Sequence, residues 1–181
     1  MTVRARSSGS GGTMRWRRDF ASVKIIVAGP SLSPKLARLY RSAIASSPYY
    51  SRRAKRTELK RFSLRHVRDG LKHRDNLFLA AVEKNSVIGA VNGTFEAGLF
   101  WIDWIVVGSS HRGQGVATAL LQSLESRLQR RRIHKVWCDS RTTNMESKAL
   151  LAKHGYSRIA TIRNHWYGQD FILWQKLLSG R

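Results

Sequence analysis

The sequence predicts an α/β fold, an α+β sandwich in which helices flank a mixed, mostly antiparallel central sheet. Two observations support this prediction. Segments with apolar residues at helical spacing are interspersed with short apolar runs that glycine, proline or asparagine residues bound. The chain has 181 residues, of which 42% are hydrophobic, and this suits one globular domain with a substantial core. We expect that domain over residues 21–181, preceded by a disordered basic arm over residues 1–20.

The arm has a composition that opposes folding. It contains Ser-Ser-Gly-Ser-Gly-Gly at residues 7–12 and no acidic residue before Asp19. It lacks the apolar segment of a secretory signal. We interpret it as a tail or as sequence ahead of a start at Met14, and an arginine- and serine-bearing organellar presequence is the alternative.

The first half of the chain predicts two helices and four strands. Gly29-Pro30 ends the first strand, and Ser33-Pro34 supplies an N-cap followed by proline at the first helical position. A turn at Lys84-Asn85 joins two strands as a hairpin. The predicted elements are a strand over 23–27, helices over 33–46 and 64–71, the hairpin strands over 77–83 and 87–94, and a strand over 98–107.

The second half predicts two helices and three strands. The first helix follows a glycine-bearing turn, and its Ala117, Leu121, Leu124 and Leu128 recur on one side. Gly155 is the expected C-cap of the second helix. The remaining predicted elements are a strand over 135–139, a helix over 146–153, and strands near 156–163 and 170–177.

Composition limits the possible functions. No apolar run approaches the roughly 20 residues of a membrane-spanning helix. The single cysteine, Cys138, excludes an internal disulfide framework and the common zinc clusters, so we expect a buried small apolar residue there, no metal and a cytoplasmic protein.

The net charge of +22 is unevenly distributed, because ten basic residues crowd the segment 52–74. Such a field attracts polyanions, and RNA or the ribosome is a possible partner. A solvated basic face with no partner is an equally weighted interpretation. No aromatic-interleaved RNA-binding signature accompanies the charges.

The turn between residues 101 and 121 carries the strongest functional signal. It joins an apolar strand to a helix through Gly113 and Gly115. Glycines let the backbone approach a ligand, and the helix adds the positive end of its dipole, so the turn predicts a phosphate site. A Walker loop would need Gly-Lys-Ser/Thr, and a dinucleotide fingerprint would need Gly or Ala in place of Thr118.

Two segments resemble the motifs of the GNAT superfamily of N-acetyltransferases. Arg112-Gly-Gln-Gly-Val-Ala117 resembles its Arg/Gln-x-x-Gly-x-Gly/Ala loop, and residues 144–156 resemble its Asn-x-x-Ala-x-x-Leu-Tyr-x-Lys-x-Gly-Phe segment. Asp103, Ile105 and Val107 match the alternating approach to the loop. The resemblance covers roughly residues 23–178 and is strongest over 99–156. A tight turn with no ligand is the alternative for the loop alone.

The resemblance implies acetyl transfer from acetyl-CoA to a primary amine by direct attack, without a metal. The implied CoA contacts are backbone groups at the end of the strand, the loop with the start of its helix, and Asn144, which would also cap the following helix. In this sequence they are Ile105, Val106, Val107, Arg112, Gly113, Gln114, Gly115, Val116, Ala117, Thr118 and Asn144.

Asp103 is the candidate general base, since it is a lone carboxylate in an apolar strand and partial burial would raise its pKa. Binding a cationic substrate without moving a proton is the alternative role. The family's tyrosine acid corresponds to Leu151, which leaves the acid unassigned; Tyr156, Tyr167, His165 and His111 are replacements, and the thiolate could also depart without one.

The acceptor is not specified by the sequence. A small amine, an amino-acid derivative and a protein amino group all remain open, and a free polycation is disfavoured by the +22 charge unless the cleft is locally acidic. The aromatic segment 164–174 either lines the acceptor side or is a core hairpin. Trp101, His165 and Tyr167 are the candidate acceptor contacts. We expect a monomer or homodimer, and a basic binding module on the same fold is the alternative function.

Overall fold

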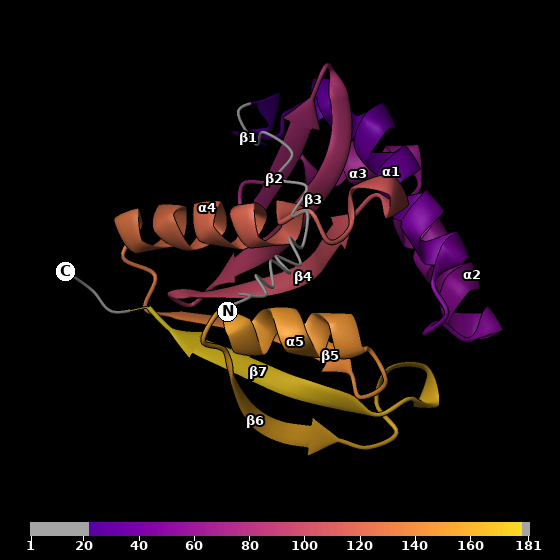
Figure 1. Ribbon diagram of the computed structural model, residues 1–181, viewed down its shortest axis with the longest axis vertical. Helices are drawn as coiled ribbons and strands as arrows, with labels where there is room; N and C mark the ends of the chain where they lie inside the picture. Colours follow the sequence, from indigo (N-terminus) through magenta and orange to yellow (C-terminus); the bar gives the residue numbers. More distant parts are fainter. Residues whose placement is uncertain (1–21, 179–181) are drawn as a thin grey trace, which may run out of the picture.

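The computed structural model describes residues 22–178, so the expected arm over 1–20 lies outside the described residues. Seven strands form one sheet in the order β1-β2-β3-β4-β5-β7-β6 (Figure 1). Every neighbouring pair is antiparallel except β4 and β5. The strands are β1 (Lys24–Val27), β2 (Asn76–Glu83), β3 (Ser86–Glu96), β4 (Leu99–Val107), β5 (Lys135–Arg141), β6 (Ser157–Ile162) and β7 (Phe171–Leu177).

Five α-helices flank this sheet, and together they confirm the predicted fold class. They are α1 (Ser33–Ser46), α2 (Arg52–Arg61), α3 (Leu64–Gly70), α4 (Val116–Arg130) and α5 (Met145–Lys153). Short 3-10 turns at Pro30–Leu32, Ser109–His111 and Trp166–Gly168 complete the described elements. None of the described helices is long and apolar enough to cross a membrane.

The sheet separates two apolar cores, and β2 shows how the sequence specifies both. Its Leu77 and Leu79 face α4 and α5, whereas Phe78 and Ala80 face α1 and α3. Successive strand residues point to opposite faces, so a strand that is covered on both sides is apolar at consecutive positions. The predicted apolar side of α4 is buried through Leu121, Leu124 and Leu128, and Val116 and Leu120 join it.

Helix α2 is the one described α-helix that the sequence analysis missed. Its ten residues contain only two apolar side chains, Ala54 and Leu59, so no apolar periodicity marks it. It begins at Ser51, whose side chain accepts a hydrogen bond from the backbone N–H of Ala54, and it ends in Lys60 and Arg61, where cations complement the helix dipole. The omission matters because α2 forms one wall of the candidate site.

Candidate active site

The two parallel strands part halfway along their length. They pair from Leu99 with Lys135 to Ile102 with Cys138, and β4 then continues to Val107 while β5 continues to Arg141 without further pairing between them. Their outer edges stay paired with β3 and β7. The inner edges therefore present unpaired backbone N–H and C=O groups, which a ligand can use.

A cleft of about 850 Å³ opens where the strands separate. It runs from the loop before α4 to the neighbourhood of α2 and the β6–β7 connection. Most of the predicted site residues line it, namely Trp101, Asp103, Ile105, Val106, Val107, Arg112, Gly113, Gly115, Val116, Ala117, Thr118, Asn144 and Tyr167. Gln114 and His165 lie beside the cleft rather than in its lining; the Gln114 amide donates to the Ser110 carbonyl oxygen, 2.8 Å away.

The donor end of the cleft is the glycine turn that leads into α4. Gly113 and Gly115 have φ of 72° and 83°, in the left-handed region that favours glycine. Gly115 precedes the helix, and no side chain of the described chain caps this start. The first N–H groups of a helix lack partners within it, so those of Val116, Ala117 and Thr118 are free to meet an anion.

Asn144 directly precedes α5, the second helix at the donor end. Its side-chain oxygen accepts a hydrogen bond from the backbone N–H of Ser147 at 3.1 Å, which makes it the N-cap of α5. It also lines the cleft, as do Glu146 and Lys153 of α5.

A β-bulge at Asp103 sets the direction of the candidate base. The register of β4 against β3 slips there, because Gly93 opposes Ile102 while Asn92 opposes Trp104. Before the bulge Ile102 faces α4, and after it Ile105 does. Asp103 and Trp104 therefore both point to the face that α1 and α2 cover.

Asp103 is partly buried, with 20% of its side chain exposed. Its carboxylate accepts long hydrogen bonds from Asn92 and Thr94, each 3.4 Å, and it lies 3.6 Å from the Arg61 guanidinium. Burial raises its pKa above the ordinary aspartate value, and Arg61 opposes that shift. A carboxyl with a raised pKa can both accept and release a proton nearer to neutral pH.

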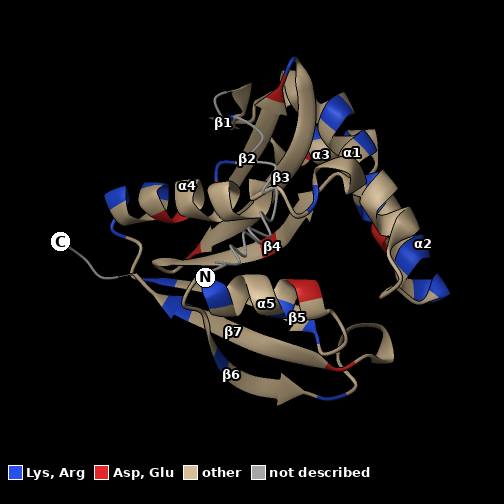
Figure 2. Ribbon diagram, viewed as in Figure 1, with Lys and Arg blue, Asp and Glu red and all other residues tan. Residues whose placement is uncertain are grey.

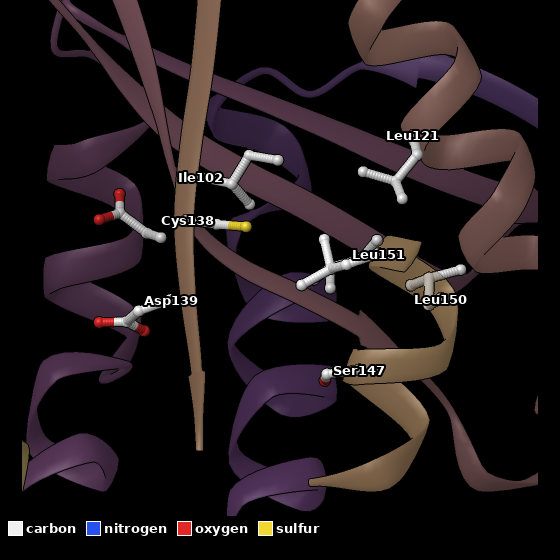
Figure 3. Close-up of a pocket in the computed structure, with 9 residues that line it drawn as sticks. Ile102, Leu121, Cys138, Asp139, Ser147, Leu150 and Leu151 are labelled. Atoms are coloured by element: carbon white, nitrogen blue, oxygen red, sulfur yellow. The ribbon is translucent and has the colours of Figure 1, made fainter. Parts of the chain in front are cut away.

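Asp139 is a second carboxylate on the same face, at the start of the unpaired part of β5. Figure 3 shows it pointing away from the side of β5 that carries Cys138, which faces Leu150 and Leu151 of α5. Burial raises its pKa, while the hydrogen bond from the Trp166 indole, 2.9 Å long, opposes the shift. Asp103 and Asp139 are the first residues beyond the last pair of β4 and β5, so they lie opposite each other where the strands separate. The negative charge of Asp139 also raises the pKa of Asp103.

The acceptor end is completed by α2 and the β6–β7 connection. Glu58 of α2 is 94% buried, and its Oε1 accepts a 2.7 Å hydrogen bond from the Tyr167 hydroxyl. Burial, with Glu58 as a second cause, raises the pKa of Tyr167 to about 12. Arg141 of β5 lies over the Tyr50 ring at 3.8 Å and donates to Gln169. Aromatic and charged side chains therefore surround this end.

The position of the expected acid is apolar. Leu151 is buried in the core beneath the separation and lines a small cavity of about 40 Å³ with Cys138 and Leu121 (Figure 3). Cys138 is buried, as predicted. Tyr156 is buried in the same core and does not line the cleft, whereas Tyr167 and His111 do.

Charge is distributed differently in the cleft and over the whole chain. Four of the chain's 11 acidic residues line the cleft, but only four of its 33 lysines and arginines do. In Figure 2, lysine and arginine instead colour much of α2 and the last turn of α4. Of the ten basic residues in segment 52–74, only Arg61 lines the cleft.

Comparison with known proteins places this geometry in a family. The family model described as the acetyltransferase (GNAT) family matches residues 37–156. The chain belongs to the GNAT family of acetyltransferases. It is an N-acetyltransferase, and the separated strands and glycine turn lie within the matched region.

Solved structures share the fold of this acetyltransferase. The ribosomal-protein-S18-alanine N-acetyltransferase from Escherichia coli is 16% identical with a TM-score of 0.70, and the match covers 88% of this chain and 96% of that one. The PaiA N-acetyltransferase from Thermoplasma acidophilum, in complex with coenzyme A, is 14% identical with a TM-score of 0.75, covering 86% and 99%. No curated protein sequence matches the chain.

Six charged residues that line the acetyltransferase cleft were not predicted as site residues, namely Glu58, Arg61, Asp139, Arg141, Glu146 and Lys153. Asp139 carried a usable signal, because it follows Cys138 in a strand parallel to the one that carries Asp103. Glu58 was harder to predict, since it lies among basic residues in a helix with no apolar stripe. Among residues 22–178, no cluster of metal-ligating side chains is present.

Proposed function

We propose that this acetyltransferase moves the acetyl group of acetyl-CoA directly to a primary amine, without a covalent enzyme intermediate. The observation that carries the proposal is the separation of β4 from β5, which joins the free helix N-terminus at Val116 to the carboxylate of Asp103 through one cleft. Donor and acceptor bound at its two ends would meet at the unpaired strand edges.

The donor end has the groups that CoA requires. Its pyrophosphate would lie on the N–H groups between Arg112 and Thr118, with the Arg112 guanidinium and the α4 dipole adding positive charge. Gln114 would contribute through the backbone. The backbone groups of Ile105 and Val107 on the inner edge would pair with the pantetheine amides as another strand does, while those of Val106 pair with β3. Asn144 and Ser147 line the opposite wall.

The chemistry needs a free amine, a stabilised oxyanion and a departing thiolate. Asp103 would take the proton of the attacking ammonium, and its raised pKa suits that step. The amine nitrogen then forms a bond to the acetyl carbon, the carbon–sulfur bond breaks, and CoA leaves with the electron pair. The second proton of the attacking nitrogen passes to the departing thiolate, directly or through solvent. Backbone N–H groups of β4 would stabilise the oxyanion. Thiolate is a tolerable leaving group, so the apolar Leu151 at the expected acid position is compatible with turnover.

Acceptor contacts would come from the other end. Trp101 and Tyr167 line the cleft, and the His165 ring lies 4.5 Å from the tilted ring of Trp166, which also lines it. In this proposal the segment 164–174 contributes to the acceptor side of the cleft.

Ligand-dependent melting tests the donor assignment. Acetyl-CoA at a hundredfold excess over its Kd stabilises a protein by about 2.7 kcal/mol, so the melting temperature should rise clearly with acetyl-CoA and with CoA. ATP at the same concentration is the matched phosphate-bearing control and should produce a smaller rise. The absence of any rise with either CoA compound would overturn the proposal.

A further inference from the structure

Glu58 has an unusual environment for a carboxylate. The residue is 94% buried, and although Oε1 accepts a hydrogen bond from Tyr167, Oε2 is buried without any partner in the described protein. A buried oxygen without a hydrogen bond costs about 1–3 kcal/mol, and more when it is charged. Such an atom in a cleft wall calls for a partner that arrives with the substrate.

Glu58 is the single acidic residue of α2, and it is buried where the helix lines the cleft. Ala54 and Glu58 are the two buried residues of α2, one helical turn apart, whereas Arg52, Arg53, Arg56 and Lys60 of the same helix are exposed. Most of the other side chains of α2 are basic. The buried carboxylate is therefore an exception to the local composition, and it lines the cleft.

Two more carboxylates share this end with Glu58, namely Asp103 and Asp139. Two arginines also line this end, and neither forms an ion pair with Glu58 among the described residues. Arg61, which is 56% exposed, pairs with Asp103 at 3.6 Å, and Arg141 lies over the Tyr50 and Phe171 rings. The acceptor end thus has one more acidic than basic group within a chain of net charge +22, which is the local acidity that a cationic acceptor needs.

Aromatic side chains line the same cleft as these carboxylates. Tyr50 stacks on Trp104 with ring centroids 5.6 Å apart, and Trp166 and Phe171 line the cleft as well. Such rings accept an alkyl chain by apolar contact and attract ammonium groups through their faces. A cleft that combines several carboxylates with aromatic surface matches an alkyl chain that carries a positive charge at each end.

From this arrangement we propose that the acceptor is a small alkyl diamine or polyamine: one amino group reacts beside Asp103, and a second, charged one binds Glu58. The proposal rests on the proposed function. Glu58 would act in specificity, and Tyr167 would fix its orientation through the hydrogen bond to Oε1. An acceptor with only one ammonium group would leave Oε2 unpartnered and lose that interaction.

A matched pair of acceptors tests this directly. 1,5-Diaminopentane and n-pentylamine have the same chain and differ by one ammonium group. We expect kcat/KM of the wild-type protein to favour the diamine by about 10²–10⁴, as a site built to bind a polar group rejects an analogue that lacks it. Equal values for the two amines, or a preference for a peptide N-terminus or for free lysine over the diamine, would overturn the proposal.

Glu58→Gln keeps the size of the side chain and removes its charge. The diamine preference should fall to within about tenfold, mainly through a higher KM for the diamine, while the melting shift with acetyl-CoA persists. Glu96→Gln, an exposed change at the end of β3, should leave the preference intact. An unchanged preference in Glu58→Gln would overturn the assignment of Glu58.

The two proposals fail in different ways. If acetyl-CoA shifts the melting temperature and pentylamine is acetylated as well as the diamine, the acceptor inference alone is wrong. If acetyl-CoA neither binds nor reacts with any amine, the proposed function is wrong, and the acceptor inference with it. The comparison of amines on the wild-type protein remains decisive even if Glu58→Gln does not fold.

Discussion

The two ends of the cleft are built in different ways. The donor end comes from one continuous stretch of chain, from the end of β4 through the glycine turn into α4, and it offers mainly backbone groups. The acceptor end is assembled from α2, β4, β5 and the β6–β7 connection, and it offers side chains. A ligand common to a whole family can be bound by backbone geometry, whereas a particular acceptor needs particular side chains.

The largest effect should come from breaking the donor end with Gly115→Glu. Gly115 has φ of 83°, so any side chain strains the turn, and a carboxylate there would oppose the phosphates electrostatically. We expect the melting shift with acetyl-CoA to disappear and transfer to become undetectable. Gln129→Glu, an exposed change with the same new charge near the other end of α4, should keep both. Normal acetyl-CoA binding by Gly115→Glu would remove the loop from the donor site.

This difference also explains what the sequence could predict. The glycine turn, Asp103 and the apolar pattern of β2 and α4 are local features, and the structure places them as the fold class requires. Glu58 depends on a helix that has no apolar stripe, because α2 is held at its ends and by two inward residues. The ion pair of Arg61 with Asp103 joins residues 42 positions apart, so no local sequence pattern predicts it.

The next largest effect should come from Asp103→Asn, where the two ends meet. If Asp103 is the base, kcat should fall by about 10²–10⁴ while the affinity for acetyl-CoA stays nearly unchanged. The acid limb of the pH–rate profile should also vanish; in the wild type that limb should lie above the ordinary aspartate pKa, since burial raises it. A loss confined to the KM of the acceptor would instead assign Asp103 to substrate binding.

Asp103→Asn should lower activity but raise the stability of the protein slightly at neutral pH. A carboxyl whose folded pKa is raised contributes stability below its unfolded pKa of about 4, and this contribution is lost as the pH rises through the folded pKa. Asp103→Asn removes that loss, so its melting temperature should exceed that of the wild type at pH 7 and approach it at pH 4. Each 1 kcal/mol corresponds to about 2–4 °C in a protein of this size. A lower melting temperature at pH 7 would show that hydrogen bonds to the carboxylate outweigh its burial.

The smallest effect on catalysis should come from the outward side of α2. Replacing Arg52, Arg53, Arg56 and Lys60 by Gln removes four exposed charges and leaves Glu58 in place. Exposed charges are screened by salt, so kcat/KM for a small amine should change by less than about threefold. Any affinity for RNA should lose salt dependence, by about 0.7–0.9 in log–log slope for each phosphate contact removed. Tight RNA binding together with no acetylation of any amine would favour the binding-module alternative.

Single-turnover transfer tests the central claim most directly. Protein in excess is mixed with acetyl-CoA labelled in the acetyl group and with a mixture of alkyl monoamines, alkyl diamines and peptides, and the reaction is quenched at intervals. Direct attack predicts that the label appears on an amine at the same rate as the CoA thiol appears, with none attached to the protein. Label that accumulates on the protein before it reaches the amine, or thiol that appears with free acetate instead of an acetylated amine, would contradict the account.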